Sequence, residues 1–157
     1  VWSYLRRAEG TPARLSVVAF GGGVATILLA FLAGALANAG HLHFSATATE
    51  TTLFYLANGV FQYTSFTAGV FLLASGLVIL RTGALDQWVG YAGAFLGTAA
   101  IVGGLGTFMD SGSLAQGEVY QQVLFFAFLL WVFVVSVLLA QRATAAPARK
   151  TAARRKR

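Results

Sequence analysis

A long uncharged segment, from Thr52 to Leu80, constrains the fold of this chain more than any other feature. A membrane-spanning helix needs about 20 consecutive apolar residues, and this segment exceeds that length without a charged side chain. At 100° per residue, its amides and several of its small residues fall within about 60° of one another; they are Asn58, Gln62, Ser65, Gly69 and Gly76. The sequence therefore predicts a helix with this face towards the inside of a membrane bundle. The opposite face is expected to contact lipid; it carries Val60, Phe71, Ala74 and Val78.

Three further apolar runs predict three further spans, which gives spans over residues 15–37, 52–80, 88–108 and 119–140. Only 10% of the 157 residues are charged, against roughly 25% in soluble domains. The predicted fold is an all-α membrane protein, an up-down bundle of four transmembrane helices over residues 15–141. A basic amphipathic lead (residues 1–14) precedes the bundle and a disordered basic tail (residues 142–157) follows it. The absence of cysteine excludes disulfides and thiolate metal sites.

The charges predict an orientation. All 11 Lys and Arg residues lie in the lead, in the turn at residues 81–87, or in the tail. Because cytoplasmic segments of membrane proteins are enriched in Lys and Arg, both termini are expected in the cytoplasm. The cations of the tail are candidates for binding anionic lipid; they are Arg149, Lys150, Arg154, Arg155, Lys156 and Arg157. No aromatic residues interleave with them to stack on bases, so no specific nucleic-acid partner is predicted.

Two of the predicted spans carry faces of small residues. Such faces let helices approach closely in lipid, where van der Waals contact drives association. The first span offers Gly23, Ala30 and Gly34, and the third offers Gly93, Gly97 and Gly104. These six residues are the predicted helix-packing positions.

The predicted outer loops contain the candidate metal ligands, which are His41, His43, Glu50, Asp110 and Glu118. Imidazoles with carboxylates suit a divalent metal such as zinc. The alternative, which we favour, is a solvated surface where the two glutamates stabilise nearby helix N-termini. Haem is disfavoured because the spans contain no histidine. No cofactor is predicted.

A polar stripe inside the second span is the candidate ligand site. Asn58, Gln62 and Ser65 either bind a ligand or form interhelical hydrogen bonds that fix the register of the bundle, and we favour the second interpretation. Trp131 lies within the fourth span, away from the interfacial belts where tryptophan is enriched. It is a candidate for stacking on a lipid or pigment, or for filling space beside the glycine-rich spans.

The turn after the second span carries a family resemblance. It reads LRTGALDQWVGYAG, with Leu80, Arg81, Thr82, Gly83, Leu85, Trp88 and Gly90 at the matching positions. With its basic lead and basic tail, the chain resembles a group of small four-helix membrane proteins of GC-rich Gram-positive bacteria. The resemblance implies the four-helix fold. It implies no activity, because the group has none assigned.

Three functions follow from these patterns. The first is a non-enzymatic accessory or scaffolding subunit, whose small-residue faces receive other membrane subunits or a second copy of the chain. The alternative is a membrane protein that binds a small molecule, lipid or pigment at Asn58, Gln62, Ser65 and Trp131. The third is a metal-dependent membrane enzyme with an outward-facing site. Membrane lipids are expected partners in each case.

Overall fold

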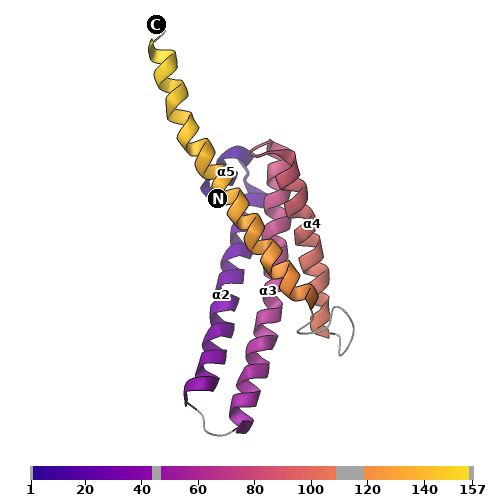
Figure 1. Cartoon of the computed structure of the whole chain (residues 1–157). Helices are drawn as coiled ribbons and strands as arrows, with labels where there is room; N and C mark the ends of the chain where they lie inside the picture. The colour runs from indigo at the N-terminus through magenta and orange to yellow at the C-terminus, as the bar shows by residue number, and fades with distance from the viewer. Residues whose placement is uncertain (1, 44–46, 109–118, 156–157) are drawn as a thin grey trace.

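The computed structural model of the chain describes residues 2–43, 47–108 and 119–155, which form helices and turns without a strand. The helices are α1 (Trp2–Glu9), α2 (Arg14–His43), α3 (Thr47–Thr82), α4 (Gln87–Gly104) and α5 (Val119–Arg155), with a short 3₁₀ turn, η1 (Leu105–Phe108), after α4. Figure 1 shows α2 and α3 as a long antiparallel hairpin, with α4 beside α3 and α5 crossing the bundle obliquely. The described part of the chain is thus all-helical apart from its turns, which confirms the predicted all-α class.

Within these described ranges, three helical segments are long and apolar enough to cross a membrane: Arg14–Ala39, Thr49–Thr82 and Val119–Arg142. The span expected at residues 88–108 is not among them. Its helix, α4, is only 18 residues long and gives way to η1 after Gly104. Eighteen residues are near the lower end of the range of about 17 to 25 residues that a transmembrane helix needs.

The α2–α3 hairpin is longer than predicted. α2 continues past Ala37 to His43, and α3 begins at Thr47, before the expected start at Thr52. At 1.5 Å per residue, the 36 residues of α3 extend about 54 Å, whereas the hydrocarbon core of a bilayer is about 30 Å thick. Tilts of membrane helices stay below about 40°, so α3 is too long to lie wholly within that core.

Towards its C-terminal end, α3 is covered by protein on both faces, which corrects the expectation of a lipid-facing side at Ala74 and Val78. Val78 is fully buried and Ala74 is 5% exposed. α2 lies against this face, because a Cβ added at Gly22 would be 2.9 Å from the backbone nitrogen of Phe71. Gly69 and Gly76 on the other face lie against α4. Apolar residues suit a helix interface and lipid equally well, and the pattern alone did not distinguish the two.

The closest helix approach lies between α3 and α4. A Cβ at Gly97 would be 2.5 Å from the backbone nitrogen of Leu73, and one at Gly76 would be 2.6 Å from that of Ala94. These distances leave no room for a side chain. The two helices therefore depend on glycine where they cross.

The other predicted packing positions differ in their surroundings. A Cβ at Gly93 would meet the Trp131 ring, one at Gly104 the Phe66 ring, and one at Gly23 the Phe71 ring. Gly34 has nothing within 4 Å of such a Cβ, and Ala30 is exposed at the rim of a groove. In α2, the helix contact is therefore centred on Gly22 and not on Ala30 and Gly34.

Three parts of the chain meet at the end of the bundle where α3 turns into α4. Gly83 ends α3 with a φ of 61°, the left-handed conformation that glycine adopts most readily. The Ala84 carbonyl accepts hydrogen bonds from the Tyr4 hydroxyl at 3.0 Å and from the Arg142 guanidinium. Arg142 also pairs with Asp86 at 3.3 Å. α1, the α3–α4 turn and α5 are thereby joined at one end.

Glu9 stabilises the start of α2 at the same end. Its carboxylate oxygens accept hydrogen bonds from the backbone N–H groups of Leu15 and Ser16 at 2.9 and 2.8 Å, and from the Ser16 hydroxyl at 2.6 Å. Burial raises the pKa of Glu9, but these hydrogen bonds, with the nearby charge of Arg81, lower it below its ordinary value of 4.5. An ionised carboxylate thus satisfies N–H groups that the first helical turn leaves without intrahelical partners.

The tail, residues 142–157, was expected to be disordered, and the structure describes its backbone as far as Arg155. α5 continues as one helix to Arg155 (Figure 1). Residues 143–153 contain six alanines (A-T-A-A-P-A-R-K-T-A-A), and alanine has the highest helix propensity. The structure does not describe the side chains of the predicted lipid-binding cations, and Lys156 and Arg157 lie outside the described residues.

Candidate functional site

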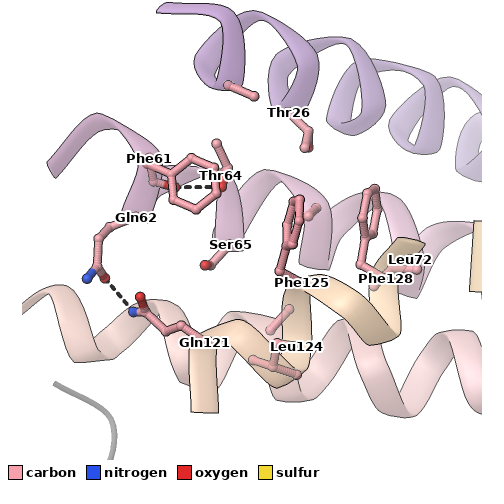
Figure 2. A pocket seen from close by; sticks show the side chains of 13 residues that line it. Thr26, Phe61, Gln62, Thr64, Ser65, Leu72, Gln121, Leu124, Phe125 and Phe128 are labelled. Carbon is pink, nitrogen blue, oxygen red and sulfur yellow. Dashed lines mark hydrogen bonds between the residues drawn. The ribbon is translucent and has the colours of Figure 1, made fainter. Parts of the chain in front are cut away.

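A groove between the helices is the best-formed candidate site, and it contains two of the predicted ligand-binding residues. It encloses about 610 Å³ of space, its open side included. All four long helices contribute to its lining, which consists of Thr26, Ala30, Phe61, Gln62, Thr64, Ser65, Ala68, Leu72, Ala100, Gln121, Leu124, Phe125 and Phe128. Figure 2 shows these side chains as sticks, with most of them labelled. We call this space the amide groove.

A pair of amides forms its polar end. Gln121 of α5 donates its Nε2–H to Oε1 of Gln62 on α3 at 2.7 Å, and Figure 2 shows the two side chains meeting across the gap. Gln62 is only 3% exposed. The pair joins helices that are far apart in the sequence, in the part of the groove farthest from Leu72 and Phe128. The distance along α3 from Gln62 to Leu72 is about 15 Å.

Aromatic rings lie along the α5 side of the groove. The Phe61 and Phe125 rings lie 6.1 Å apart, and both side chains are more than 40% exposed. Phe128, another lining residue, packs at 6.1 Å from Phe71, and Phe71 lies 6.1 Å from Trp131. Rings of α3 and α5 therefore contact one another along the groove.

Trp131 lies beyond Phe71 and is not part of the lining. Its side chain is 4% exposed and donates Nε1–H to the Val89 carbonyl at 3.0 Å. Its ring lies against Gly93, where an added Cβ would be 2.8 Å from a ring carbon. The tryptophan fills the space beside a glycine-rich helix and has a partner for its polar atom.

The predicted polar stripe is only partly brought together. Gln62 and Ser65 line the amide groove, whereas Asn58 is not among the lining residues and donates Nδ2–H to the Phe54 carbonyl of its own helix at 3.0 Å. The sequence predicted interhelical hydrogen bonds for this stripe, and Gln62 makes one, but Gln121 was not predicted as its partner. The available signal for Gln121 was its position, as an amide at the start of an otherwise apolar span. That position does not show which helix α5 faces.

Hydroxyl groups add polarity on the α2 side of the groove. Thr26 donates to the Gly22 carbonyl at 2.8 Å and lies 2.9 Å from the hydroxyl of Thr67. Thr64 donates to the Phe61 carbonyl at 2.5 Å. These threonines therefore already have local partners, which leaves the Gln62–Gln121 pair as the distinctive polar feature of the groove.

The lining determines what the groove can do chemically. None of its side chains ionises near neutral pH, and no histidine or carboxylate lies among them to activate a hydroxyl group. Amides offer both donors and acceptors. The groove is therefore built for apolar contact with one neutral hydrogen-bonding end.

The candidate metal ligands remain dispersed or lie outside the described residues. Glu50 lies in the first turn of α3, while His41 and His43 belong to the last turn of α2, where side chains are not described. Asp110 and Glu118 fall outside the described residues. Among the residues that the structure does describe, no three His, Asp or Glu side chains gather as a metal site.

Comparison with known proteins finds no family model, no curated protein and no solved structure that matches the chain.

Proposed function

We propose that this chain is an integral membrane protein that binds an elongated, uncharged amphiphile, such as a lipid or pigment with one hydrogen-bonding group, in the amide groove. The observation that carries the proposal is the Gln62–Gln121 pair at one end of an otherwise mainly apolar groove about 15 Å long. Ligand sites are mostly apolar, with a few polar groups that fix orientation. The absence of charged lining residues favours a neutral head group.

The proposal includes a topology. All four long helices α2–α5 cross a bacterial cell membrane, and the end that carries Arg6, Arg81 and Arg142 lies in the cytoplasm. The positive-inside rule supports this orientation. At about 27 Å, α4 is close to the thickness of the hydrocarbon core. Its glycines are buried against α3 and α5 and are not exposed to lipid.

The binding proposal is tested by the molecules that co-purify with the chain. Wild type, Gln62→Leu and Gln121→Leu are purified identically from membranes in a mild detergent, and bound molecules are weighed by native mass spectrometry. We expect a bound species in wild type that both variants lose. Their thermal stability should change little, because polar contacts in membrane proteins contribute under about 2 kcal/mol.

Gln122→Leu is the matched control, because Gln122 is exposed beside Gln121 and does not line the groove. It should retain the bound species. The proposal fails if wild type carries no such molecule, or if all three variants retain it equally.

A second candidate function is an accessory subunit of a larger membrane assembly. The observation that favours it is the exposed apolar surface on the part of α3 that extends away from α4, where Phe54, Tyr55 and Leu56 are each more than half exposed. Loss of a stoichiometric partner protein in a Phe54→Ser, Tyr55→Ser double variant would support this function. Retention of the partner in that variant would count against it.

A further inference from the structure

The Gln62–Gln121 pair lies close to the C-terminal end of α4. A Cβ added at Gly104, the last residue of that helix, would be 2.9 Å from the Phe66 ring. Gln62 precedes Phe66 by four residues, which places it about one turn farther towards the start of α3. In the proposed topology α4 spans the hydrocarbon core, so the amide pair lies at about the outer surface of that core.

The lining of the groove along α3 ends level with the middle of α4. Leu72 is the lining residue of α3 farthest from Gln62, and a Cβ added at Gly97 would be 2.5 Å from the backbone nitrogen of the next residue, Leu73. Gly97 lies about 10 Å before the end of α4. Half of the hydrocarbon core is about 15 Å thick. The groove thus extends from the surface of the core towards its midplane, through the depth of about one leaflet.

The open side of the groove faces lipid in the same topology. Its exposed lining residues are Ala30 of α2, Phe61 of α3 and Phe125 of α5. Phe31 and Phe126, which follow two of these residues in the sequence, are also exposed. These side chains are apolar, as expected for a surface in contact with acyl chains. A lipid in the surrounding bilayer therefore has a sideways path into the groove.

We propose that the amide groove binds one acyl chain of a membrane lipid whose head group is uncharged and carries a hydroxyl; this ligand class rests on the proposed function. The depth of the groove supports an acyl chain, because a chain of one leaflet ends near the midplane. A pigment that spans the bilayer would extend well beyond Leu72. A hydroxyl both donates and accepts hydrogen bonds, as the amides do, whereas a charged head would find no charged lining residue to pair with.

The test is a lipid titration of the purified full chain in a mild detergent, with bound lipid counted by native mass spectrometry. Dioleoylglycerol supplies an uncharged head with one hydroxyl, and dioctanoylglycerol supplies the same head with shorter chains. Dioleoyl phosphatidylglycerol supplies a charged head. Wild type should bind one dioleoylglycerol in preference to the charged lipid. Gln62→Leu should weaken the binding of both uncharged lipids.

Ala68→Phe tests the path of the chain. Ala68 lines the groove between Gln62 and Leu72, so the added ring would occupy space that a long chain needs. Dioleoylglycerol should bind about tenfold more weakly, which is within the usual cost of overpacking, and dioctanoylglycerol should be affected less. Val70→Phe is the matched control, because Val70 lies on the same helix, is 37% exposed and does not line the groove. It should bind both lipids as wild type does.

Melting curves verify that each variant is folded, and Ala68→Leu replaces Ala68→Phe if the larger ring prevents folding. Three results would overturn this proposal and leave the proposed function standing. They are a co-purifying uncharged molecule without an acyl chain, equal binding of the charged and uncharged lipids by wild type, and equal effects of Ala68→Phe on the two diacylglycerols. Failure of wild type to bind any uncharged amphiphile, co-purified or added, would overturn both proposals.

Discussion

At the residue scale, Gly97 and Gly34 show how differently two glycines of apolar helices are used. An added Cβ at Gly97 would meet the backbone of α3, which has no flexible side chain that can move aside. The same atom at Gly34 would meet nothing within 4 Å. The sequence assigned both residues to helix packing, because a small residue on a helix face has the same pattern whether or not another helix lies there.

Gly97→Ala should therefore destabilise the bundle by about 1–3 kcal/mol, the usual cost of overpacking. Gly34→Ala should be neutral or slightly stabilising, because alanine is the better helix former by roughly 0.5–1 kcal/mol. Thermal unfolding in one detergent measures both. Equal losses would mean that α3 and α4 do not cross at Gly97.

The amides of the groove show which part of the site could be predicted from the sequence. Gln62 was predicted from its position on the polar face, and it does line the groove. Its partner, Gln121, could not be predicted, because the contact depends on the oblique path of α5 and on the aromatic contacts between that helix and α3. Asn58 has the same periodicity as Gln62 but bonds to its own helix.

At the element scale, α2 begins at a carboxylate supplied from α1. Glu9→Ala should remove hydrogen bonds at the N-terminus of α2 and destabilise the chain by about 1 kcal/mol, as for other lost helix caps. Because the hydrogen bonds hold the pKa of Glu9 below 4.5, its stabilising effect is complete above that pH. The effect is lost as the pH falls through the lowered value.

Unfolding curves of wild type and Glu9→Ala, recorded from neutral pH down to about pH 3, check this expectation. The difference between the two proteins should shrink on acidification. A difference that stays constant with pH would show that the Glu9 carboxylate does not stabilise α2 through its charge.

α3 shows which properties of an element could be predicted from its sequence. Its helical state and its ability to cross a membrane follow from a long uncharged run. Its central position, covered by α2 and α4, does not, because Val78 and Ala74 suit protein and lipid alike. The glycines of α4 likewise serve contacts with α3 and α5 that the sequence pattern alone does not assign to a partner helix.

At the scale of the whole molecule, the proposed topology places the amide pair and the arginines of α1 towards opposite faces of the membrane. The Gln62–Gln121 pair would lie towards the outer face, and Arg6 and Arg7 at the cytoplasmic face. The α2–α3 hairpin would extend beyond the outer surface, because α3 is much longer than the hydrocarbon core is thick.

Cysteine labelling tests this topology. Cysteines at Thr49 and Phe108 should react with an impermeant thiol reagent in intact cells, whereas cysteines at Ser3 and Asp86 should react only after lysis. All four positions are exposed in the structure. Labelling of Asp86→Cys in intact cells would contradict the orientation, and protection of Phe108→Cys would contradict a membrane crossing by α4.

The most direct test of the proposed ligand is photo-crosslinking from the groove itself. Benzoylphenylalanine replaces either Phe125, which lines the amide groove, or its neighbour Phe126, which is 67% exposed and is not among the lining residues. After illumination in native membranes, adducts are identified by mass. Binding predicts one dominant adduct from position 125 and a mixture of bulk lipids from position 126. The same mixture from both positions would contradict a specific ligand in the groove.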